Sequence, residues 1–144
     1  MLEQAELTIY TGGTFDLLHP GHLNFLRTCR RLGEVTVSLN SDEFIDEYKG
    51  QAPVLSYDER REMLLALPAV SNVIENTGGA DSKIAILAVA PNVIAIGSDW
   101  ARRDYYSQMG FNQDFLDYNG ISIVYIPYTR GISTTAIKKR LTDR

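Results

Sequence analysis

The feature that most constrains this chain is an apolar segment that leads through two glycines into a helix opened by proline, over residues 10–22. Residues 7–10 are apolar enough for a short buried strand, and Gly12 and Gly13 permit a tight backbone after it. Pro20 suits the first helical position, where its missing N–H costs no hydrogen bond. The pattern predicts the opening strand and helix of a β-α-β unit.

Both histidines of the chain lie in this segment, His19 at the predicted N-cap and His22 one turn into the helix. Side chains three apart at a helix start point the same way, beside unpaired N–H groups and the positive end of the helix dipole. Such a place suits a phosphate. Two alternatives are ordinary surface histidines and a metal pair, for which Asp16 is the one further ligand near in sequence.

Composition narrows the class of protein. At 144 residues with 44% apolar residues, the chain is expected to form a single domain, 1–144, with a real core. Net charge is −4 and the fourteen Lys and Arg are dispersed, which argues against a nucleic-acid surface. We see neither a signal peptide nor a membrane span, so we expect a cytoplasmic protein with no membrane partner. The lone Cys29 is expected to be a small buried hydrophobe.

The rest of the chain alternates apolar strands with helical segments. Strands are expected at 7–10, 35–39, 70–75, 92–96 and 121–126, and helices at 20–32, 44–48, 56–67, 81–90, 102–118 and 134–141, with a break in the helix at 102–118 around Gly110. This order predicts an α/β fold with a five-stranded parallel sheet flanked by helices. Ligands bind such sheets beyond the carboxyl ends of the strands, so residues 12–22, 97–100 and 128–135 should meet in one pocket.

Two segments carry a family resemblance. The run from Gly13 through His19 to His22 closely resembles the HxGH signature of the nucleotidyltransferase superfamily, in the form found in cytidylyltransferases. Residues 130–138 are similar to the second nucleotide-binding signature of that family, and the likeness extends from about Leu7 to Leu141. The resemblance, nearest to the glycerol-3-phosphate cytidylyltransferases, implies a Rossmann-like fold and a homodimer. It also implies transfer of CMP from CTP, with Mg²⁺, to a small phosphomonoester such as sn-glycerol 3-phosphate.

In such a transfer an anionic phosphate oxygen attacks the α-phosphorus and expels pyrophosphate, so the site needs hydrogen-bond donors rather than a general base. The resemblance casts His19 and His22 as catalytic donors. Around them it implies nucleotide-binding roles for Gly13, Thr14, Phe15, Asp16 and Gly21. Gly21 is expected to leave room for the phosphates. Asp16 acts through Mg²⁺ in this interpretation, and the alternative is a turn aspartate that bonds its own backbone.

Two cations are implied for the acceptor side. Lys49 matches the family lysine that reaches the phosphates of both substrates, and Arg60 matches the arginine expected on the acceptor phosphate. Gln51 replaces a second lysine that many relatives carry, which weakens the clamp. The alternatives are a solvated lysine and, for Arg60, a surface ion pair at helical spacing.

The base and triphosphate contacts are expected after the fourth and fifth strands. Asp99 resembles the carboxylate that accepts from the exocyclic amine of cytosine, with Trp100 packed alongside. The last helix start should bind phosphate through its N–H groups and hydroxyls. The residues that the resemblance implies there are Arg130, Gly131, Ile132, Ser133 and Thr134. The glycerol-phosphate relatives carry their arginine at the position of Tyr128, so we expect Arg130 to supply that contact from an extended loop. The alternative is that Arg130 faces solvent and Tyr128 only packs.

Other functions stay open. One is an adenylyltransferase of the same superfamily with another phosphate acceptor, although Asp99 before Trp100 favours CTP. Another is a nucleotide-binding regulatory domain without turnover, against which the two intact histidines argue. The acceptor is the least supported part, because Pro68 and Ser71 occupy positions that are charged in glycerol-phosphate enzymes.

Overall fold

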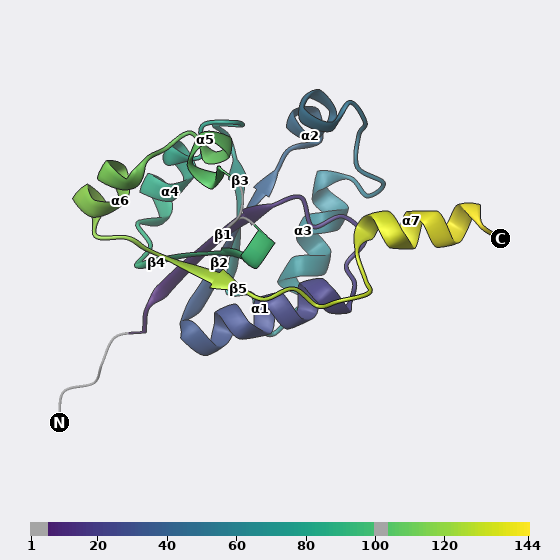
Figure 1. Ribbon diagram of the computed structural model, residues 1–144, viewed down its shortest axis with the longest axis horizontal. Coiled ribbons are helices and arrows are strands. Elements are labelled where there is room, and N and C mark those ends of the chain that lie inside the picture. The colour runs from purple at the N-terminus through teal and green to yellow at the C-terminus, as the bar shows by residue number, and fades with distance from the viewer. Residues whose placement is uncertain (1–5, 100–103) are drawn as a thin grey trace.

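The sheet at the centre of the molecule has five parallel strands in the order β3-β2-β1-β4-β5 (Figure 1). The structure is a computed structural model and describes residues 6–99 and 104–144. The strands are β1 (Thr8–Gly13), β2 (Glu34–Asn40), β3 (Asn72–Asn76), β4 (Val93–Gly97) and β5 (Ser122–Ile126). The predicted five-stranded parallel α/β fold is confirmed, and β1 continues through the two glycines that we expected to form a turn.

The helices of the described residues follow the predicted order. They are α1 (Pro20–Leu32), α2 (Asp42–Lys49), α3 (Tyr57–Leu65), α4 (Lys83–Val89), α5 (Tyr105–Met109), α6 (Gln113–Asn119) and α7 (Thr134–Thr142). The side chains of Ser41, Ser56 and Ser133 cap α2, α3 and α7, because each accepts a backbone N–H from the first turn of its helix. The helix predicted at 102–118 is divided, because Gly110 ends α5 with φ 78°.

Each face of the sheet has its own apolar core. Leu26 and Cys29 of α1 and Leu64 of α3 pack on one face, where burial raises the pKa of the Cys29 thiol to about 12. Ile86 of α4 and Leu116 of α6 pack on the opposite face. A parallel sheet covered on both faces leaves its strand ends as the place for a site.

The chain changes direction across the sheet beside β1. The order runs outward from β1 through β2 to β3 and then returns to β4 on the other side of β1. The carboxyl ends of β1 and β4 therefore form a topological switch point, where α/β sheets bind ligands. The segments after β1, β4 and β5 reach this edge.

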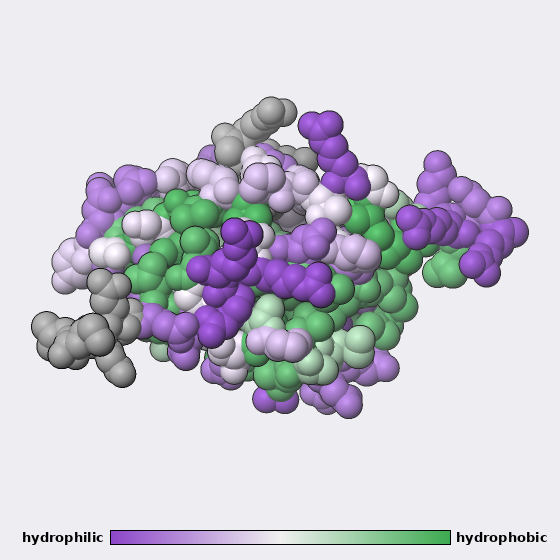
Figure 2. All heavy atoms as spheres, turned by 90° about the horizontal axis from the view of Figure 1, so that it is seen from below, coloured by the Kyte–Doolittle hydropathy of each residue, from purple (hydrophilic) through white to green (hydrophobic). Residues whose placement is uncertain are grey.

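The last helix, α7, extends away from the sheet (Figure 1). It contains no buried residue, and the protruding end on the right of Figure 2 is almost wholly hydrophilic. Its start is fixed to the body by Thr134, whose Oγ1 donates to the carbonyl of Asp16 at 2.9 Å. Within residues 6–99 and 104–144, no helix has the length and apolar character needed to cross a membrane.

Candidate active site

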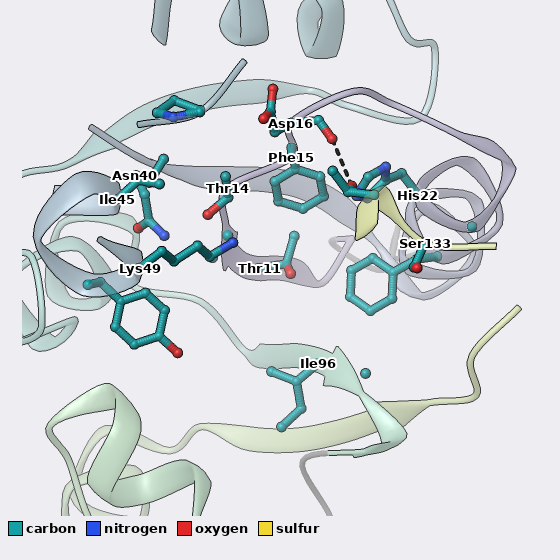
Figure 3. A pocket seen from close by; sticks show the side chains of 18 of the residues that line it. Thr11, Thr14, Phe15, Asp16, His22, Asn40, Ile45, Lys49, Ile96 and Ser133 are labelled. Carbon is teal, nitrogen blue, oxygen red and sulfur yellow. Dashed lines mark hydrogen bonds between the residues drawn. The ribbon is translucent and has the colours of Figure 1, made fainter. Parts of the chain in front are cut away.

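A cleft of about 530 Å³ opens at the carboxyl ends of the strands, within the range of small-molecule sites. The β1–α1 turn, the end of α2 and the start of α7 contribute to its lining (Figure 3). The predicted residues that line it are Gly13, Thr14, Phe15, Asp16, His19, Gly21, His22, Lys49, Ile132, Ser133 and Thr134. The two signatures, more than a hundred residues apart in sequence, thus meet in one cavity.

The Nδ1 atoms of both histidines accept backbone N–H groups at the start of α1. Nδ1 of His19 accepts the N–H of Gly21 at 3.0 Å, and Nδ1 of His22 accepts the N–H of His19 at 3.2 Å. The ring centroids are 3.8 Å apart. Because each Nδ1 is an acceptor, the proton of each neutral ring lies on Nε2. Among the described residues no hydrogen bond uses either Nε2, so the turn presents two N–H donors for a ligand.

Both rings are neutral at pH 7. Burial, with a smaller contribution from neighbouring His19, lowers the pKa of His22 to about 4. Burial also lowers the pKa of His19. The sequence left room for an imidazolium, but the structure favours neutral imidazoles that donate without carrying charge.

Glycines and two strained residues shape this turn. A Cβ on Gly21 would lie 2.8 Å from Cε1 of His19, so Gly21 makes room for an imidazole, where we expected it to make room for phosphates. A Cβ on Gly13 would lie 2.8 Å from the Phe15 ring. Phe15 and Leu17 have φ of 50° and 51°, which non-glycine residues rarely adopt. Such strain concentrates at functional sites.

Asp16 is not the turn aspartate that we weighed as the alternative. Its side chain is buried, Oδ2 accepts the N–H of Val54 at 2.7 Å, and Oδ1 accepts the N–H of Leu55 at 3.0 Å. The carboxylate therefore anchors the loop before α3. No cluster of three or more His, Cys, Asp or Glu that could hold a metal occurs in the described part of the chain, so a Mg²⁺ contact through Asp16 would need nucleotide oxygens and stays a prediction.

Arg60 is a structural cation, and the prediction that it binds the acceptor phosphate is wrong. Its side chain is 0% exposed and does not line the cleft. Its Nη1 donates to the carbonyl of Thr14 at 2.8 Å, and its Nη2 donates to the carbonyl of Asn40 at 2.9 Å and to Oδ1 of Asp42 at 2.7 Å. Nε donates to the carbonyl of Leu55 at 3.1 Å. Arg60 thus joins four segments beneath the site.

The expected base reader lies just beyond β4. Oδ1 of Asp99 is buried and has no hydrogen-bond partner among the described residues. A Cβ on Gly97, which lines the cleft, would lie 3.0 Å from that oxygen and 3.6 Å from the Tyr128 ring. Trp100 lies outside the described residues. The unpaired carboxylate oxygen is an acceptor in need of a donor.

The loop before α7 differs from the expectation. Arg130 is exposed and neither it nor Gly131 lines the cleft, whereas Tyr128 does. Gly131 has φ 81°, so the backbone turns where we expected an extended loop. The prediction that Arg130 takes over the phosphate contact is not supported by this geometry, because extension was its premise.

Several lining residues escaped the sequence analysis. Lys138 lies on α7 with Nζ 4.0 Å from Oδ2 of Asp16, and its place at the end of the second signature was an available signal. Asn40 and Asn76 end β2 and β3, where polar residues at strand ends could have indicated the cleft. Tyr48 carried no comparable signal.

The fold and the paired histidines define a nucleotidyltransferase-type enzyme, and comparison with known proteins assigns the family. The family model described as cytidylyltransferase-like matches residues 10–140, so this chain belongs to the cytidylyltransferase-like family. It is 32% identical over 134 residues to the glycerol-3-phosphate cytidylyltransferase of Staphylococcus aureus (strain NCTC 8325 / PS 47), covering 92% of this chain and 93% of that one.

Other relatives differ in their named functions. The FAD synthase of Thermococcus sibiricus is 36% identical over 100 residues, covering 69% of this chain and 68% of that one. The bifunctional protein HldE of Syntrophotalea carbinolica is 32% identical over 144 residues, but the chain spans only 28% of its length. A solved lipopolysaccharide core biosynthesis protein from Thermoplasma volcanium GSS1 has the same fold, with a TM-score of 0.67, 23% identity and coverage of 87% of this chain and 98% of that one.

Proposed function

We propose that this protein transfers CMP from CTP to a small phosphorylated alcohol, with sn-glycerol 3-phosphate as the leading acceptor. An oxygen of the acceptor phosphate forms a bond to the α-phosphorus. The bond from that phosphorus to the bridging oxygen breaks, and pyrophosphate leaves with the electron pair. The products are a CDP-alcohol and pyrophosphate.

The observation that carries the proposal is the pair of neutral imidazoles with free Nε2–H groups at the switch point. The acceptor oxygen is already ionised, so no proton has to be removed from it. Negative charge grows on the bridging oxygen as the bond breaks, and preorganised donors stabilise that charge. We assign His19 and His22 to the α-phosphate and the bridging oxygen.

Cations and a helix start complete the proposed phosphate site. Lys49, at the end of α2, and Lys138, on α7, line the same cleft from different elements. We assign Lys49 to the acceptor phosphate and Lys138, with the start of α7, to the β- and γ-phosphates. Mg²⁺ is proposed to enter with the triphosphate, whose oxygens would supply most of its ligands.

The base is proposed to meet Asp99. Its unpaired Oδ1 would accept from an exocyclic amine, which cytosine carries at this position and uracil does not. Adenine also carries an exocyclic amine, and a 36% identical relative is named FAD synthase. Adenylyl transfer to another phosphate acceptor is therefore the second candidate.

A matrix of the four nucleoside triphosphates against a panel of phosphomonoesters, read by pyrophosphate release, tests the proposal. Release with CTP and a phosphorylated alcohol is expected. Release with ATP instead would establish the second candidate. Nucleotide binding without release in any combination would identify a non-catalytic domain. The homodimer also stays a prediction, which sedimentation equilibrium measures.

A further inference from the structure

An asparagine pair at the ends of two neighbouring strands has no part in the mechanism above. Asn40 ends β2 and Asn76 ends β3, and the two residues are partners in the parallel register. Both line the cleft. Figure 3 shows Asn40 on the same side of the cleft as Ile45 and Lys49, which belong to α2. The pair therefore lies beside the cation that we assign to the acceptor phosphate.

Hydrogen bonds determine the orientation of the Asn76 side-chain amide. Nδ2 of Asn76 donates to Oδ1 of Asn40 at 2.9 Å and to the carbonyl of Gly79 at 3.0 Å. An amide nitrogen has two hydrogens, so both are used. A flipped Asn76 would place its oxygen against the carbonyl of Gly79, which excludes the opposite orientation.

The orientation of Asn76 sets that of Asn40. Because Oδ1 of Asn40 accepts from Asn76, its Nδ2 is the polar atom left over. No hydrogen bond among the described residues uses this Nδ2, and Asn40 is half-buried in the cleft wall. The pair thus presents a neutral donor to whatever occupies the cleft next to Lys49.

Stability does not explain the pair. Asn76 is 8% exposed, and its Oδ1 is buried with no partner among the described residues. A buried carbonyl without a donor weakens folding, so the pair is not explained by stability alone. Asn76 accepts the loss while both of its N–H groups hold Asn40 and the turn at Gly79. This arrangement points to a role in binding.

We propose that Asn40 and Asn76 form the subsite that recognises a hydroxyl group of the acceptor. Nδ2 of Asn40 donates to the hydroxyl oxygen while Lys49 meets the phosphate, and Asn76 is a positioning residue that aims Asn40. The inference rests on the proposed function and deepens it, because it selects hydroxylated phosphomonoesters over alkyl phosphates of the same length.

The test compares two acceptors of equal chain length, sn-glycerol 3-phosphate and n-propyl phosphate, with CTP held saturating. Wild type should use the hydroxylated acceptor with the higher kcat/KM. In Asn40→Ala this preference should fall about tenfold, because one hydrogen bond to an uncharged group is lost. The change should appear in the KM for sn-glycerol 3-phosphate, with the Kd for CTP unchanged. Asn119→Ala, on the exposed end of α6, is the matched control.

Two isosteric variants separate recognition from structure. Asn40→Asp still accepts from Asn76 but presents an acceptor where Asn40 presents a donor, so a purely structural role predicts the wild-type preference and our proposal predicts a changed one. Asn76→Asp can accept from Asn40 Nδ2 and turn the Asn40 oxygen to the cleft, which predicts the same change with Asn40 intact. An unchanged preference in both Asn40 variants would overturn the subsite.

The failure of the subsite and the failure of the proposed function give different results. If wild type transfers no nucleotide to any acceptor, calorimetric titration of sn-glycerol 3-phosphate and n-propyl phosphate replaces the kinetics. Tighter binding of the hydroxylated compound by wild type, lost in Asn40→Ala, would support the subsite without turnover. Equal binding of the two compounds by wild type would overturn it.

Discussion

The histidine turn, residues 13–22, and the second-motif loop, residues 127–133, face the same cleft but are held in opposite ways. The turn is fixed by buried groups: Arg60 holds the carbonyl of Thr14, and the two histidines bond to their own helix start. The loop is exposed at Tyr128 and Arg130 and leads into a helix with no buried residue. The contrast indicates that the reaction centre is held by buried groups, whereas the second-motif loop is held by contacts at the surface and at the start of α7.

Removal of a donor from the histidine turn should have the largest effect. His19→Asn keeps an N-cap side chain but has no Nε2–H, and His22→Ala removes the second donor. Each should lower kcat about 10²- to 10³-fold, the usual loss for one donor to developing charge. Steady-state kinetics measure this, with thermal unfolding as the check that the fold is kept. Near-normal kcat in either folded variant would contradict the mechanism.

Loss of the buried cation should come next, in stability rather than in chemistry. Arg60→Met leaves three backbone carbonyls and Asp42 without their donor. The free energy of unfolding should fall by about 3 kcal/mol, as for other broken buried ion pairs. Urea titration measures the loss. The exposed neighbour Arg61, changed to Met, should shift stability by no more than about 0.5 kcal/mol. Equal losses of stability in both variants would contradict the structural role assigned to Arg60.

A smaller effect should separate two cations of the second-motif region. Lys138 lines the cleft and Arg130 does not. Lys138→Ala should weaken CTP binding about tenfold and flatten its salt dependence, because a phosphate contact is lost. Arg130→Ala should change the Kd less than about twofold. Calorimetry at two salt concentrations compares them, and the reverse ranking would mean that the loop rearranges when CTP binds.

The histidine turn should also give the protein a pH-dependent stability. The pKa of His22 is lowered to about 4 in the folded protein, against about 6.5 in the unfolded chain. Below pH 6.5 the unfolded chain therefore binds more protons, so the free energy of unfolding should fall as the pH drops toward 4. Urea titrations from pH 7.5 to 4 measure this fall, which should be shallower in His22→Asn. Parallel profiles would show that His22 does not titrate as described.

The sequence predicted what is local and periodic. The succession of strands and helices follows from apolar patterns, and the histidine turn follows from residues adjacent in the chain. The meeting of residues 12–22 with the loop before α7 in one cleft was also predicted, because parallel strands end together at one edge of the sheet.

The predictions that failed concern which partner a side chain finds. Arg60 matches a family arginine by position, but its four acceptors come from segments that the sequence does not pair. Asp16 bonds to backbone 38 and 39 residues away. Arg130 lies outside the cleft lining, and a positive φ at Gly131 turns the loop that we expected to be extended. Long-range partners and single backbone dihedrals are set by the assembled fold, so a pattern within one segment cannot report them.

The hydrogen bond from Thr134 to the carbonyl of Asp16 spans 118 residues, and it bears on the order in which the protein is assembled. The sheet and both cores use residues up to Ile126, so they can form before the segment that becomes α7 docks. The cleft closes on that side only when this last segment returns to the first turn, and once β5 has joined the sheet only the residues between Ile126 and Thr134 have to close. The body of the protein can therefore fold before its cleft is complete.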